Sequence, residues 1–183
     1  MFKSITIFAI LFCICILTGN LSAQTDSSII QVIKDNFKKI NQTNNWTKTE
    51  SIKLEETTEG GEMLVYYDKA EIKKLTINEF GEMFKQIREY YLLNEKLSFA
   101  YFKLYKYNRP INWDSTAMKE NKNDQVWDFN KSIIEEQRFY FDSSEMLQWI
   151  NKNNLKEKNS TQSFKEKAIE VMKEFNRLIK KIK

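Results

Sequence analysis

The chain has 183 residues, with 29 Lys and Arg against 25 Asp and Glu, and it contains no histidine. Its 42% hydrophobic and 14% aromatic residues are typical of a folded chain, and the length fits one domain. Without histidine, the chain cannot use Ser-His-Asp or Cys-His catalysis or a His-ligated metal site. Its four glycines are too scattered for a nucleotide-binding loop, and no Ca²⁺-loop pattern occurs. We therefore expect neither a cofactor nor a bound metal ion.

Residues 1–23 have the order of a secretory signal peptide. Lys3 gives a positive start, residues 5–17 are almost wholly apolar, and small residues lead up to Ala23. The apolar run is shorter than the roughly 20 residues that a membrane-spanning helix needs. We expect cleavage after Ala23 and export to the periplasm or the extracellular space, with an uncleaved anchor as the alternative. The mature chain, residues 24–183, would be a single domain without cysteine.

The first element expected in the mature chain is an amphipathic helix over residues 26–40. Asp26 or Ser27 can cap its start, because a short side-chain oxygen accepts a hydrogen bond from a free amide there. The apolar residues recur at steps of three and four, which is the spacing of one helix face. They are Ile29, Ile33, Phe37 and Ile40.

Residues 46–107 change to a period of two, which predicts half-buried strands. Aromatic and β-branched residues dominate the alternating positions, and Gly60 with Gly61 marks a turn. The alternating residues are Ile52, Leu54, Met63, Val65, Tyr67, Leu75, Ile77, Leu97, Phe99, Tyr101, Tyr105 and Tyr107. Residues 80–91 fit a helical stripe as well as a strand, and we favour a strand there because of a repeat that passes through this region.

Three segments share one pattern: residues 66–72, 90–97 and 140–147. Each holds an aromatic pair, a short polar stretch, a Glu four residues after the second aromatic, and then an apolar residue. This order predicts a strand end, a turn and the next strand. The units resemble the aromatic-pair strand–turn repeats of MORN-type proteins and of small exported bacterial proteins, although their turns lack glycine. The resemblance covers about a third of the chain and implies a topology rather than a function.

A long polar connection is expected at residues 108–130, which contain the only proline, Pro110. Strand character returns at residues 133–141, residues 144–150 fit a helical turn or a short strand, and a polar link follows at 151–159. Loops longer than about 12–15 residues are usually functional or disordered. The connection at 108–130 is therefore a region in which to look for a binding site.

Residues 163–182 show the clearest helical stripe of the chain, and Ser163 with Glu166 fits a capping box at its start. The stripe consists of Phe164, Ala168, Val171, Met172, Phe175, Leu178, Ile179 and Ile182. Such a helix must cover an apolar surface, and the sheet is the only partner of sufficient size. We therefore predict an α+β fold: an antiparallel β-meander with the N-terminal and the C-terminal helix packed on one face.

Catalysis without histidine or a retained cysteine would require carboxylates, Tyr, Lys or Ser. The conspicuous carboxylate pairs are Glu55-Glu56 and Glu135-Glu136. Adjacent residues of a strand point to opposite faces, so neither pair can act together on one substrate as acid and base. The sequence nominates no catalytic residues.

The best candidates for binding are Tyr105, Tyr107, Arg109 and Trp113, which join a strand end to the long loop. Exposed Tyr, Trp and Arg are typical of interaction hot spots and of surfaces on which sugars stack. The alternative interpretation is structural: the two tyrosines pack in the core, Arg109 meets a carboxylate, and Trp113 fixes the loop.

Residues 151–183 carry ten basic and four acidic residues, so the last helix could contact anionic lipid or an acidic partner. The alternative is a solvated helix face. We expect no nucleic-acid partner, because the chain is expected to be exported and the basic stretch is poor in arginine. The sequence thus predicts an exported, non-catalytic binding or interaction protein of the bacterial envelope, with a protein or glycan as partner. An exported carboxylate-dependent hydrolase and an envelope-associated scaffold using the basic helix are the alternatives.

Overall fold

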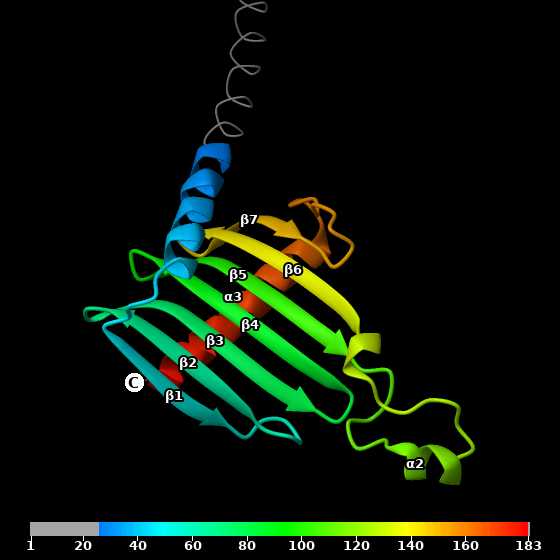
Figure 1. Ribbon diagram of the computed structural model, residues 1–183. Helices are drawn as coiled ribbons and strands as arrows, with labels where there is room; N and C mark the ends of the chain where they lie inside the picture. Colours follow the sequence, from blue (N-terminus) through cyan, green and yellow to red (C-terminus); the bar gives the residue numbers. More distant parts are fainter. Residues whose placement is uncertain (1–25, 183) are drawn as a thin grey trace, which may run out of the picture.

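The computed structural model describes residues 26–182, and these residues form one antiparallel sheet with a helix against each of its faces (Figure 1). Seven strands follow one another in chain order across the sheet. They are β1 (Lys48–Leu54), β2 (Gly61–Asp68), β3 (Glu71–Gly81), β4 (Phe84–Leu93), β5 (Lys96–Lys106), β6 (Ile133–Asp142) and β7 (Glu145–Ile150). The predicted α+β meander is confirmed. The ambiguous residues 80–91 are strand rather than helix, but a turn at residues 82–83 divides them between β3 and β4.

Helices flank the sheet and occupy the long connection. The N-terminal helix covers residues 26–41, and α3 (Gln162–Ile182) follows β7. The loop at 108–130 holds the short helix α2 (Ser115–Glu120) and ends in the 3-10 helix η1 (Phe129–Lys131). The predicted signal peptide, residues 1–23, lies outside the described residues. Within residues 26–182, no helix is both long enough and apolar enough to cross a membrane.

Three of the hairpins share one geometry, and they coincide with the three segments of the predicted repeat. Each has a two-residue turn, two paired positions and then a shift of register. The shift lies between Tyr66 and Tyr67, between Tyr91 and Leu92, and between Tyr140 and Phe141. Non-glycine residues adopt positive φ in each turn: Lys69, Asn94, Glu95, Ser143 and Ser144. These turns therefore form without glycine, at some cost in backbone strain.

The middle unit of the repeat differs by one residue from its sequence alignment. Tyr91 and Leu92 occupy the places that Tyr66 and Tyr67 hold in the first unit, so the pair Tyr90-Tyr91 is not equivalent to Tyr66-Tyr67. The extra residue of the bulge in this hairpin is Ser98, whose hydroxyl donates to the carbonyl of Tyr91 at 3.0 Å. The alignment by aromatic residues alone therefore set the middle unit one position too early in the sequence.

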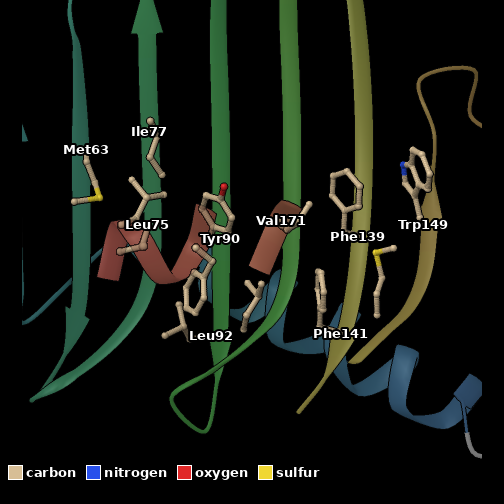
Figure 2. Packing of buried hydrophobic residues seen from close by; sticks show 14 of the residues in the cluster. Met63, Leu75, Ile77, Tyr90, Leu92, Phe139, Phe141, Trp149 and Val171 are labelled. Atoms are coloured by element: carbon tan, nitrogen blue, oxygen red, sulfur yellow. The ribbon is translucent and has the colours of Figure 1, made fainter. Parts of the chain in front are cut away.

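The helix α3 crosses one face of the sheet, called here the back face, and buries the larger core. Phe164, Val171, Phe175 and Leu178 are its buried residues. Figure 2 shows side chains from β2, β3, β4, β6 and β7 gathered around Val171. The start of α3 is capped by Thr161, whose hydroxyl accepts from the amide of Phe164 at 3.3 Å. The predicted capping box at Ser163 and Glu166 is therefore wrong by two residues.

The N-terminal helix packs on the opposite face, called here the front face. Its buried residues Ile33 and Ile40 join Tyr91, Phe99 and Tyr140 in a second core. The expectation that both helices share one face is thus corrected. Because Tyr90 and Tyr91 are adjacent in β4 and both fully buried, this strand needs cover on both faces. Figure 1 shows α3 running behind the strands, whereas the N-terminal helix stands at one end of the sheet.

A chain of charged side chains fastens α3 to the back face. Arg88 on β4 contacts Glu79 on β3 and Glu174 on α3, each at 2.5 Å. Arg177 then links Glu174 to Glu56 in the β1–β2 loop. Both Arg88 and Glu79 are largely buried, so the charges are compensated within the protein rather than by water.

Candidate functional site

A pocket of about 430 Å³ lies on the front face, between the N-terminal helix and strands β4, β5 and β6. The N-terminal helix covers only one end of the front face, and the pocket lies beside this helix. Its lining residues are Ile33, Lys34 and Phe37 from the helix, Glu89 from β4, Phe99 and Tyr101 from β5, and Arg138 and Tyr140 from β6. This volume is within the range of sites that hold small ligands.

The floor of the pocket is a set of interlocked rings. The ring of Phe37 lies 4.9 Å from that of Tyr91 and 5.1 Å from that of Phe99, centre to centre. The ring of Phe99 lies 4.9 Å from that of Tyr140. Edge-to-face and tilted ring contacts of this kind fix the orientation of the side chains. The floor is therefore preformed and apolar.

The helix is held above this floor by polar contacts at two levels. The amide of Asn36 donates to the carbonyl of Leu92 at 3.1 Å. Further along the helix, the side-chain oxygen of Asn41 accepts from Lys74 at 3.1 Å and lies 3.1 Å from the Tyr91 hydroxyl. These bonds set the height of the helix over the strands, and hence the depth of the pocket.

The rim of the pocket is charged. The guanidinium of Arg138 donates to Glu136 at 3.0 Å and lies 5.8 Å from the ring centre of Tyr101. The hydroxyl of Tyr101 hydrogen-bonds to the same carboxylate, which lowers the pKa of Glu136. Burial raises the pKa of Tyr101, and the bond to Glu136 raises it further, so the phenol stays protonated. The contacts with Glu136 and Arg138 thus fix the orientation of the Tyr101 ring, which forms one wall of the pocket.

The remaining rim charges differ in how they are compensated. Glu89 is paired with Lys74 at 2.6 Å and accepts from the Tyr91 hydroxyl at 2.8 Å. Lys34 is exposed and forms no ion pair or hydrogen bond with any of the residues that the structure describes. A bound molecule would therefore meet one uncompensated ammonium at the helix side of the pocket.

The four residues predicted for binding lie at the far end of β5 and in the long loop, outside this pocket. Tyr105 is half-buried on the front face and packs against Phe129 with ring centres 5.2 Å apart. Tyr107 is 8% exposed and contacts the rings of both Trp127 and Phe129. The two tyrosines are thus brought together by η1 and the residues before it.

Arg109 and Trp113 lie within the fold of the loop itself. The Arg109 guanidinium donates to the side-chain oxygen of Asn123 at 2.8 Å and to the carbonyl of Asn108 at 2.9 Å. The carbonyl of Trp113 accepts from the amide of Trp127 at 2.8 Å, and the Trp113 side chain is half-buried. Arg109 thus bonds mainly to an amide and a backbone carbonyl, and the carboxylate of Asp124 lies at 3.9 Å. A binding role for the four residues stays a prediction.

Glu135 and Glu136 have separate partners, as adjacent strand positions predict, whereas Glu55 and Glu56 lie in the loop after β1 and not in a strand. Glu135 binds Lys106 and Lys152, whereas Glu136 binds Tyr101, Lys103 and Arg138. A different pair is brought together: Glu79 and Glu174 meet at the two ends of the Arg88 guanidinium. Hydrogen bonds from Arg177 and the charge of Arg88 lower the pKa of Glu174, which is opposite to what a general acid needs.

The pocket was missed from the sequence because its residues come from three strands and a helix with no local motif. One signal was available: uninterrupted apolar runs such as residues 90–92 and 139–141 indicate strands covered on both faces. Among residues 26–182, no group of three or more acidic, His or Cys side chains is arranged to hold a metal ion. Comparisons with protein-family models, curated proteins and solved structures found no match to this chain.

Proposed function

We propose that the chain is an exported, non-catalytic binding protein and that its site is the front-face pocket beneath the N-terminal helix. The observation that carries this proposal is the preformed ring floor of Phe37, Phe99 and Tyr140 under a cavity of about 430 Å³. An apolar floor with a few polar groups at its rim is the usual construction of a small-molecule site.

Binding is favoured over carboxylate catalysis by the state of the acidic groups. Each carboxyl in the described chain whose pKa is shifted is shifted downward, by hydrogen bonds from basic or phenolic side chains. A hydrolase of this type needs one carboxyl with a raised pKa to act as the acid. Glu89, the carboxylate that lines the pocket, forms an ion pair with Lys74.

The proposal is tested with the neutral fluorophore N-phenyl-1-naphthylamine, which gains fluorescence in apolar sites. Residues 24–183 are titrated with it as the parent protein and as two variants, Tyr101→Ala and Tyr105→Ala. Both tyrosines lie on β5 and face the front, but only Tyr101 lines the pocket. We expect Tyr101→Ala to weaken binding about tenfold and Tyr105→Ala to leave it unchanged.

The matched pair also separates the two candidate sites. Loss of binding in Tyr105→Ala alone would move the site to the long loop with Tyr107, Arg109 and Trp113. Equal binding by the parent and both variants would overturn the assignment of the pocket. Circular dichroism of each variant checks that the sheet is intact.

Export is tested separately by fractionating cells and measuring the intact mass of the product. A mass matching residues 24–183 outside the cytoplasm supports cleavage after Ala23. An uncleaved product in the membrane fraction would instead make residues 1–23 an anchor and favour the envelope-scaffold alternative.

A further inference from the structure

We infer that the pocket takes an anionic amphiphile, with its apolar part on the ring floor and its acidic group between Lys34 and Arg138. This inference rests on the proposed function, because it names the ligand class of the same site. It is carried by the excess of positive charge at the rim and by the apolar character of the floor.

The charges around the pocket do not cancel. Glu136 is shared by Arg138 at 3.0 Å and Lys103 at 3.3 Å, and Glu89 is taken up by Lys74. Among the lining residues themselves, one carboxylate, Glu89, stands against two cations, Lys34 and Arg138. An anionic group placed at the rim would compensate part of this excess, whereas a cationic group would add to it.

The two cations nearest the opening come from opposite walls. Lys34 lies on the helix, one residue after the buried Ile33, and Arg138 lies on β6 beside Tyr140. Arg138 is held by Glu136 and the Tyr101 ring, whereas Lys34 is exposed and forms no ion pair within residues 26–182. An acidic group with two or three equivalent oxygens, such as a planar carboxylate or a tetrahedral sulfonate, suits this arrangement of two donors on opposite walls.

A small inorganic anion would leave most of the pocket empty. The rings of Phe37, Phe99 and Tyr140 contribute apolar surface that only a hydrocarbon or aromatic body can cover. A fatty acid and an aromatic carboxylate share the required chemistry, an apolar body carrying one negative group. The experiment must therefore distinguish these two sources.

Two fluorophores with the same aromatic skeleton isolate the contribution of the anion. 8-Anilinonaphthalene-1-sulfonate is N-phenyl-1-naphthylamine with a sulfonate added. At low salt we expect the sulfonate probe to bind residues 24–183 about fivefold more tightly than the neutral probe. Raising the salt concentration should remove most of this difference, because the rim is open to solvent.

Three variants assign the difference to the rim. Lys34→Gln and Arg138→Gln should each weaken the sulfonate probe about three- to fivefold more than they weaken the neutral probe. Lys38→Gln is the matched control: Lys38 is exposed on the same helix but lies outside the pocket lining, so both probes should bind as in the parent. Circular dichroism again checks the fold of each variant.

The outcomes separate this inference from the proposal on which it rests. Equal affinity for the two probes, or no effect of Lys34→Gln and Arg138→Gln, would overturn the anionic class while the pocket assignment stands. Insensitivity of both probes to Tyr101→Ala would overturn the pocket itself. Decanoate and 1-naphthoate are then used to displace the sulfonate probe: displacement by only one of them assigns the aliphatic or the aromatic source. Displacement by neither would contradict the carboxylate amphiphile.

Discussion

The two faces of the sheet are built from alternate residues of the same strands, yet they are covered very differently. The back face lies under α3, a helix of 21 residues that contributes four buried side chains to the core. The front face lies under the N-terminal helix, which buries Ile33 and Ile40 and covers one end only. The back face therefore holds the larger core, whereas the front face keeps a pocket over a floor of aromatic rings.

This difference shows how one meander can separate stability from binding. On the back face, the charged pairs of Arg88 and Arg177 fasten α3 to the sheet and line a groove of about 990 Å³ beside it. On the front face, comparable pairs lie on the open sheet and define a rim. The same residue types thus hold a helix in place on one face and leave a ligand site accessible on the other.

The largest expected effect comes from removing a ring of the back face. Phe139 is fully buried between the rings of Phe102 and Trp149, so Phe139→Ala should lower the free energy of unfolding by about 4 kcal/mol. Tyr101→Ala, on the front face, removes a half-buried ring and should cost about 1 kcal/mol. Urea denaturation measures both, and equal losses would contradict the division of the two faces.

The buried charge on the back face gives the next effect. Arg88→Met leaves Glu79 and Glu174 without their shared partner and should destabilise the protein by about 3 kcal/mol. Arg138→Met is the front-face control, with a side chain 33% exposed, and should cost less than about 1 kcal/mol. If Arg88→Met left the free energy of unfolding unchanged, the charged network would add nothing to the docking of α3.

Acid should weaken the attachment of α3 at Glu56. Bonds from Arg177 and then Lys181 hold the pKa of Glu56 at about 2, below its ordinary 4.5. Because the folded pKa is depressed, the stabilisation is present above pH 4.5 and is lost as the pH falls toward 2. Glu56→Gln should lose about 1 kcal/mol at neutral pH, after allowance for solvent screening, and nothing near the acid end of this range.

The control for the acid experiment is the front-face pocket. Binding of N-phenyl-1-naphthylamine to Glu56→Gln should match the parent, because Glu56 contacts only α3 residues among its ion pairs within residues 26–182. Weaker binding in this variant would show that the two faces are coupled through the sheet.

The smallest effect concerns a turn, which belongs to neither face. Asn94 and Glu95 adopt φ of 50° and 62°, a region that costs a non-glycine residue more than it costs glycine. Glu95→Gly creates the favoured Asn-Gly pair and should stabilise the protein by about 0.5 kcal/mol. Glu82→Gly, in the turn after β3, is the control: Glu82 lies outside the left-handed region, so glycine should slightly destabilise it. Thermal unfolding compares the two.

The strands and both long helices could be predicted from the sequence because their patterns are local. A period of two identified the strands through Met63, Val65 and Tyr101, and the stripe from Phe164 to Ile182 identified α3. Helix placement is not local. It follows from which face each apolar residue occupies, and the adjacent buried residues Tyr90 and Tyr91 show that both faces required cover.

The pocket is harder to predict for the same reason. Phe37, Tyr101 and Arg138 meet only because the N-terminal helix crosses β4 to β6 at a height set by Asn36 and Asn41. No spacing within any one segment encodes that height. For the residues predicted in the long loop, the residue type was the misleading signal. Tyr107 and Arg109 are typical of binding sites by type, but both contact residues of the loop itself.

The order of the strands has a consequence for how the chain reaches this structure. Each strand pairs with the next along the chain, so the sheet can grow pair by pair, with short loop closures everywhere except at the long connection between β5 and β6. By contrast, the ion pair of Arg177 with Glu56 joins residues 121 positions apart. We therefore expect a folding nucleus in the hairpins and late docking of α3: substitutions in the turns should change the folding rate, and substitutions at Leu178 should chiefly speed unfolding.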